Sequence, residues 1–103
     1  MSTTTAKKIT RHYGRILKQA HYPVKAIYLF GSQAKGQAHR WSDIDVAVIS
    51  NRTRTNDDDR LALWQLRRAV DLRIEPYSFT QRDFGDHTNP LVNEILKTGI
   101  RIL

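Results

Sequence analysis

The sequence contains no cysteine and no apolar run long enough to cross a membrane. A chain without cysteine has neither a disulfide framework nor a thiolate metal site. The N-terminal stretch MSTTTAKKITRHYGRIL also lacks the apolar core of a signal peptide. These absences exclude disulfide scaffolds and zinc–thiolate domains, and we expect a cytoplasmic protein without membrane contact.

Acidic residues are scarce beside basic ones, with 10 Asp and Glu against 17 Lys and Arg and a net charge of +7. This excess favours an anionic partner such as a nucleotide, a nucleic acid or an acidic protein, although it also serves solubility alone. The 103 residues, 40% of them apolar, suffice for a modest core. We therefore expect one domain over residues 1–103.

Hydrophobic periodicity and turn residues predict the secondary structure. The predicted elements are a helix over 6–20, strands over 24–30 and 43–50, a helix over 57–70, a strand over 70–79 and a helix over 90–98. Asn56 is expected to cap the second helix, on which Leu61, Trp64 and Val70 lie near one face. Residues 100–103 are a short strand that serves either as core or as a contact in a homo-oligomer. This order predicts an α/β (α+β) fold with helices flanking one mixed β-sheet.

Two glycines, Gly31 and Gly36, bracket a turn between the first two predicted strands. A P-loop is excluded because Gln37 and Ala38 stand where lysine and a hydroxyl residue are required. A dinucleotide fingerprint is excluded because the third glycine is missing. A turn of this kind suits a phosphate group, with Ser32 as an added donor. The alternative is that Gly31 only permits a tight turn.

Asp43 and Asp45 are separated by one residue at the start of a predicted strand. Residues i and i+2 share a face of a strand, so both carboxylates project together while Ile44 faces the other side. Neighbouring carboxylates repel each other unless a cation lies between them, and Mg²⁺ prefers a few carboxylates with phosphate oxygens. A solvent-facing polar stripe is the alternative, but the apolar Ala47 continues the same face.

A third carboxylate is expected from the strand predicted over 70–79, which carries Asp71 and Glu75 on one face. Asp71 stands at the strand start, where a neighbouring strand would bring it beside the aspartate pair, and it is the first choice. Glu75 directly precedes Pro76, which interrupts the strand, and is the second choice. An ion pair with a nearby arginine is the alternative for each.

Together these features resemble the signature of the minimal nucleotidyltransferases, a family of the DNA polymerase β-like nucleotidyltransferase superfamily. The resemblance rests on GSQAKG at 31–36, a ten-residue spacer from Ser32 to Asp43, and DIDVAV at 43–48. VDL at 70–72 resembles the strand that carries the third acid of that family. Gln33 departs from the basic or aromatic residue often found at its position.

The resemblance implies Mg²⁺-dependent transfer of a nucleoside monophosphate to a protein or small-molecule acceptor, with AMP from ATP as the first choice of nucleotide. Two Mg²⁺ ions are implied. The resemblance gives catalysis and metal binding to three acids: Asp43, Asp45 and Asp71. It gives binding of the NTP to the turn residues Gly31, Ser32 and Lys35.

Family members of this size commonly occur beside a HEPN-type helical protein as a toxin–antitoxin pair, and some add AMP to that partner. The resemblance thus implies an antitoxin enzyme. The alternative is a non-catalytic antitoxin that occludes a helical partner. Direct nucleic-acid binding is not expected, because the aromatic residues are not interleaved with basic ones.

Overall fold

A four-stranded mixed sheet forms the centre of the protein, in the strand order β3-β2-β1-β4. The computed structural model describes residues 1–37 and 42–103. β1 (Val24–Phe30) is antiparallel to β2 (Ile44–Ser50) and to β4 (Ile100–Arg101), whereas β3 (Ile74–Thr80) runs parallel to β2. This α+β architecture confirms the predicted fold class.

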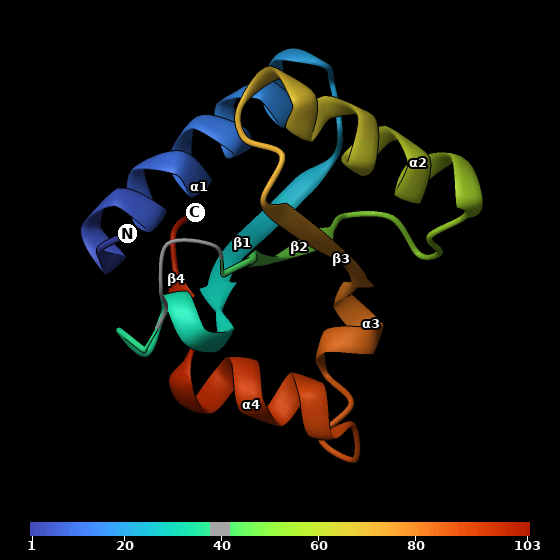
Figure 1. Ribbon diagram of the computed structural model, residues 1–103. Helices are drawn as coiled ribbons and strands as arrows, with labels where there is room; N and C mark the ends of the chain where they lie inside the picture. Colours follow the sequence, from blue (N-terminus) through green and yellow to red (C-terminus); the bar gives the residue numbers. More distant parts are fainter. Residues whose placement is uncertain (38–41) are drawn as a thin grey trace.

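Helices cover both faces of the sheet (Figure 1). α1 (Thr3–Gln19) and α2 (Asp57–Leu66) pack on one face, and α3 (Gln81–Phe84) and α4 (Pro90–Thr98) lie on the other. Strand alternation divides β2 between the two resulting cores. Val46 packs under α1 and α2, whereas Ala47 packs under α4.

The inward residue of α2 is one that the sequence analysis did not single out. Leu63 is 1% exposed and its carbonyl accepts a hydrogen bond from the Tyr13 hydroxyl of α1 at 2.8 Å. Leu61 and Trp64, which were placed near one face of the helix, are 54% and 41% exposed, so that face is not the buried one. The helix also ends at Leu66 rather than at residue 70, and a short 3₁₀ turn, η2 (Arg67–Ala69), follows. Contact with α1 thus decides which side of α2 is buried.

β3 starts later than predicted and continues through Pro76. The chain turns at Asp71, whose carboxylate accepts a hydrogen bond from the backbone N–H of Arg73 at 2.9 Å, and such a local bond competes with strand pairing. Ile44 N–H donates to the Arg73 carbonyl at 2.8 Å. Because alternate residues of a strand turn their backbone groups to opposite edges, Pro76 faces the outer edge, where its missing N–H breaks no ladder bond.

Several other sequence predictions are confirmed. Asn56 caps α2 in a capping box with Asp59, and α4 spans residues 90–98 as expected. Ile100 and Ile102 pack against the core, so the C-terminal segment belongs to the sheet.

Within the described ranges no helix is long and apolar enough to span a membrane. The glycine-bracketed turn is described as far as residue 37, and the rest of the spacer, 38–41, lies outside the described residues.

Candidate active site

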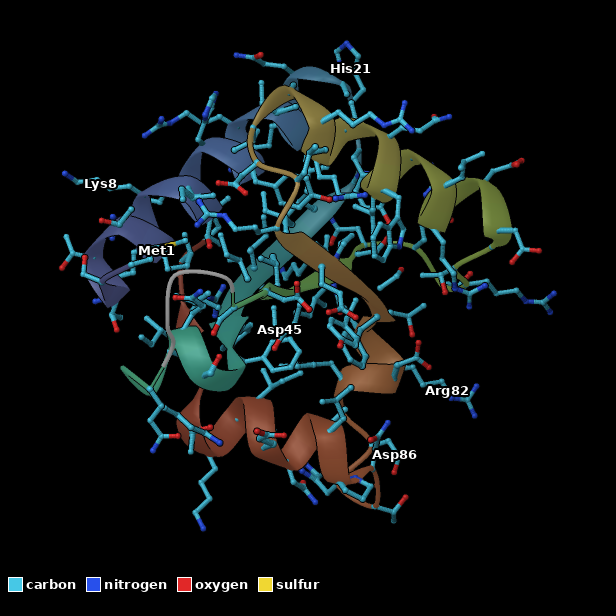
Figure 2. The ribbon with its side chains drawn as sticks, in the orientation of Figure 1. Met1, Lys8, His21, Asp45, Arg82 and Asp86 are labelled. Atoms are coloured by element: carbon cyan, nitrogen blue, oxygen red, sulfur yellow. The ribbon has the colours of Figure 1, made fainter. Side chains whose placement is uncertain are left out.

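Two acidic residues, Asp45 and Glu75, stand side by side at the start of two parallel strands. The register of β2 and β3 pairs them directly, and strand alternation turns both toward the face covered by α4. Asp43 precedes β2 by one residue, shares that face by alternation and is exposed. Figure 2 shows Asp45 near the centre of the molecule, between the strands and α4.

The surroundings of Asp45 are strongly unfavourable for a negative charge. Burial is the main cause that raises the pKa of Asp45 from 3.8 to about 6, and the charges of Glu75, Asp43 and Glu94 follow in that order. A side-chain hydrogen bond with Glu75 acts in the same direction. Asp45 is therefore the carboxylate in the site that most needs a proton or a cation nearby.

Tyr77 extends this acidic group along β3. Its hydroxyl donates a hydrogen bond to Glu75 Oε1 at 3.3 Å, and its ring packs edge-on against Phe30 with the ring centres 5.1 Å apart. Burial, followed by the charges of Asp45 and Glu75, raises the pKa of Tyr77 to about 12. Tyr77 thus remains a neutral hydrogen-bond donor at physiological pH.

The glycine turn lies directly against Asp45. η1 (Gly31–Gln33), a short 3₁₀ turn, follows β1, whose last residue, Phe30, pairs with Asp45. Gly31 has φ +73°, and a Cβ atom there would clash with Asp45 Oδ2. The backbone at Gly31 can approach the carboxylate closely only because this residue has no side chain.

Gly31→Ala is expected to destabilise the protein more than Gly36→Ala. Both glycines have positive φ, +73° and +68°, but a Cβ at Gly36 would meet only Thr3 Oγ1 at 3.8 Å. Gly36→Ala should cost about 1 kcal/mol for the left-handed backbone alone, whereas the clash with Asp45 should raise the cost of Gly31→Ala to about 3 kcal/mol. Urea unfolding of both variants measures the difference, and equal costs would contradict the close packing on Asp45.

Lys35 at the end of this turn is paired with a residue that sequence reasoning missed. Its Nζ lies 3.2 Å from Oε1 of Glu94 on α4, and both side chains are partly exposed. Glu94 also adds to the negative field at Asp45. The pair therefore joins the glycine turn to α4 beside the acids.

Asp71 is not placed where the sequence argument put it. It precedes β3, and its carboxylate binds the Arg73 guanidinium, with Oδ2 and Nη2 2.6 Å apart. This hydrogen-bonded arginine lowers the pKa of Asp71. The structure therefore brings Glu75, the second choice, beside Asp45, while Asp71 makes the arginine ion pair that was its alternative.

The donor atoms fit a hard divalent ion that binds together with phosphate. Among the described residues, no three acidic or histidine side chains are gathered into a metal-holding cluster. Mg²⁺, however, is usually held by one or two carboxylates plus substrate phosphates, and Asp45 and Glu75 supply such a pair. A cation would also relieve the like-charge repulsion that raises the pKa of Asp45.

Tyr77 and Glu94 were absent from the sequence prediction for different reasons. Tyr77 was detectable, because residues i and i+2 of a strand share a face and Glu75 was already a candidate. Glu94 carried no such signal, since nothing local to 90–98 indicates that this helix packs beside the turn at residues 31–35. Its position became apparent only from the tertiary structure.

Comparison with known proteins shows the family of this chain. The sequence matches the family described as nucleotidyltransferase domain over residues 12–100, a span that includes every acid of the site. The chain belongs to this family. The resemblance to the minimal nucleotidyltransferases is thereby confirmed.

Individual relatives include a protein adenylyltransferase and toxin–antitoxin structures. Over 56 residues, the chain is 40% identical to the protein adenylyltransferase MntA of Shewanella oneidensis, a match that spans 54% of this chain and 37% of the relative. A solved toxin–antitoxin structure with AMP-PNP has a TM-score of 0.69 and 26% identity, with 90% of this chain and 72% of that chain covered.

A second solved structure, an MntA–HpeT toxin–antitoxin mutant, has a TM-score of 0.61 and 28% identity, with 86% of this chain and 68% of that chain covered. In that protein two aspartates, two positions apart, are replaced by glutamate. The spacing of those aspartates equals that of Asp43 and Asp45 here.

Proposed function

We propose that this chain is a Mg²⁺-dependent nucleotidyltransferase that transfers AMP from ATP to a hydroxyl group of a protein. The observation that carries the proposal is the pairing of Asp45 with Glu75 on adjacent strands, directly beside the Gly31 turn. Family membership supplies the reaction class, and the named relatives supply the nucleotide and the kind of acceptor. Residues 1–103 are proposed to act as one nucleotidyltransferase domain.

The acids are assigned to metal binding and proton transfer. We assign two Mg²⁺ ions to the pair Asp45 and Glu75, with the exposed Asp43 as a further ligand once the phosphates of the nucleotide are bound. Bound Mg²⁺ would neutralise phosphate charge and stabilise the attacking and leaving oxygens. Glu75 accepts the proton of the attacking hydroxyl as the new O–P bond forms and pyrophosphate departs. Asp71 is proposed only to hold Arg73 at the start of β3, because its carboxylate is already engaged there.

The glycine turn is assigned to the triphosphate. Gly31 and Ser32 begin a short turn whose first backbone N–H groups have no partner inside it, and such groups bind phosphate oxygens. Lys35 is near enough to add a positive charge, and its present partner, Glu94, is only partly buried and can release it. These contacts would hold pyrophosphate as the leaving group.

The proposed partner is a HEPN-type helical protein, because solved structures similar to this chain are toxin–antitoxin proteins and one of them holds a HEPN toxin bound to an MNT antitoxin. The clustered acids favour an enzyme over an antitoxin that acts by occlusion alone, since occlusion gives no reason to bury Asp45 against Glu75. A cytoplasmic location remains a prediction.

Labelled ATP tests this function. With [α-³²P]ATP and Mg²⁺, the protein should label a HEPN acceptor. Two probes are suitable: the product of the neighbouring gene and the S. oneidensis HEPN toxin, which carries AMP groups in a solved complex with its MNT antitoxin. Asp43→Asn should abolish labelling, as should removal of Mg²⁺ with EDTA. Tight binding of a HEPN probe that is unaffected by Asp43→Asn, without any label transfer, would instead support occlusion.

A further inference from the structure

The order of the strands restricts the side from which an acceptor reaches the site. In phosphoryl-type transfer the attacking and leaving oxygens lie roughly in line on opposite sides of phosphorus. The glycine turn follows β1 on one side of Asp45, and β3 with Glu75 lies on the other. If the proposed function holds and pyrophosphate leaves along the turn, the acceptor hydroxyl must arrive over β3.

A hollow of about 300 Å³ lies on that side, at the outer edge of β3. It is lined mainly by apolar groups from three elements, among them Trp64 of α2, Tyr77 of β3 and Leu91 of α4. Tyr77 also donates its hydrogen bond to Glu75, so this side chain connects the hollow to the acids. A mostly apolar hollow next to a few convergent polar groups is the usual form of a substrate site.

The backbone beside the hollow is suited to pairing with an extended chain. β3 is an edge strand, and no further strand among the described residues pairs with its outer side. The bond from Ile44 N–H to the Arg73 carbonyl fixes the alternation, so the carbonyl of Pro76 and both backbone groups of Ser78 face outward. The outward N–H of Ile74 already donates to the Asp71 carbonyl at 3.2 Å, so pairing would start at Pro76. Extended peptides bind such edges by adding a strand, while neighbouring hollows accept their side chains.

We propose that this hollow, bounded by Trp64, Tyr77 and Leu91, is the acceptor site, and that it takes an extended polypeptide segment that pairs with β3. The segment would place an apolar or aromatic side chain against Trp64 and present its hydroxyl to Glu75. The free strand edge favours a polypeptide over a small molecule, which would have no use for the outward backbone groups. The inference rests on the proposed function and adds the position of the acceptor and the way in which it binds.

Trp64→Ala tests the acceptor site with the S. oneidensis HEPN toxin and the neighbouring gene's product as probes. Truncation of a central aromatic anchor should raise the KM for the labelled probe about 30-fold. The kcat and the KM for ATP should change little, because Trp64 belongs to α2, which packs on the sheet face opposite to the one that carries Asp45. Trp64→Phe should restore most of the affinity, since it keeps an aromatic surface in the hollow.

Leu61→Ala is the matched control. Leu61 lies one turn earlier on the same helix and is 54% exposed, but it does not line the hollow. Its loss should leave the KM for the acceptor unchanged, and circular dichroism establishes that both variants fold. An unchanged KM in Trp64→Ala, or an equal rise in Leu61→Ala, would refute the acceptor site.

The two proposals fail in distinguishable ways. A wild-type protein that neither binds Mg²⁺·ATP by calorimetry nor releases pyrophosphate disproves the proposed function itself. A wild-type protein that labels a HEPN probe with an acceptor KM independent of Trp64 retains the function and disproves the acceptor site. Labelling of the HEPN probe with an acceptor KM that depends on Trp64 supports both.

Discussion

Asp45→Asn is expected to stabilise the protein at neutral pH in the absence of Mg²⁺ and nucleotide. The same substitution should lower the rate of AMP transfer at least about 100-fold. Burial and the neighbouring carboxylates raise the pKa of Asp45 to about 6, which means that its charge is unfavourable in the folded state. The asparagine keeps the shape but carries no charge. Without the carboxylate, however, Mg²⁺ and the phosphate it neutralises lose a ligand. Stability and activity should therefore change in opposite directions.

The sign and the pH window follow from the two pKa values. Between the ordinary value of 3.8 and about 6, folded Asp45 holds a proton that the unfolded chain has released. Wild-type stability should fall as pH rises through this window and stay low above it. For a fully buried group, this fall in the free energy of unfolding would be roughly 3 kcal/mol. Solvent around the half-buried Asp45 screens this to about 1 kcal/mol.

Thermal unfolding at pH 4 to 8 without divalent ions measures this effect. At pH 7.5, Asp45→Asn should unfold about 4–8 °C higher than the wild type, and the gap should close toward pH 4. Mg²⁺ with a non-hydrolysable ATP analogue should stabilise the wild type more than the variant. A variant that is less stable than the wild type at pH 7.5 would show that Asp45 makes a favourable contact rather than a repulsive one.

Glu75→Gln is expected to remove most of the transfer rate, whereas Asp71→Asn should retain it. Glu75 pairs with Asp45 in the strand register, while Asp71 is held by Arg73 before the strand begins. Loss of a general base typically costs about 100-fold to 10,000-fold in rate. Loss of the partly exposed pair with Arg73 should cost only about 0.5–1 kcal/mol of stability.

Single-turnover label transfer on the two variants, with saturating Mg²⁺·ATP, separates the assignments. Asp71→Asn serves as the matched control, because it removes one carboxylate from the same region of the chain. Loss of rate in Asp71→Asn with a normal rate in Glu75→Gln would reverse the assignment made here. Unfolding midpoints of both variants exclude misfolding as the cause.

The third acid illustrates where sequence reasoning reaches its limit. Both Asp71 and Glu75 were identified as candidates from their residue type and position. The choice of Asp71 over Glu75 depended on where the strand starts. The hydrogen bonds between Asp71 and Arg73 hold the chain in a turn, so β3 begins only after them. The buried side of α2 was out of reach for a related reason, since Leu63 faces the core through its contact with Tyr13, 50 positions away in the chain.

The sequence alone determined the main helices and strands, apart from the end of α2 and the start of β3, and the aspartate pair. Strand alternation fixes Asp43 and Asp45 on one face, and the glycine at residue 31 indicates a tight turn, which the structure shows with φ +73°. These are local properties, set by periodicity and backbone sterics within a few residues. Only the tertiary structure decided that Glu75 stands beside Asp45, that Glu94 reaches Lys35 and that Trp64 borders a hollow. Such pairings depend on strand register and helix packing across the chain, which no local pattern specifies.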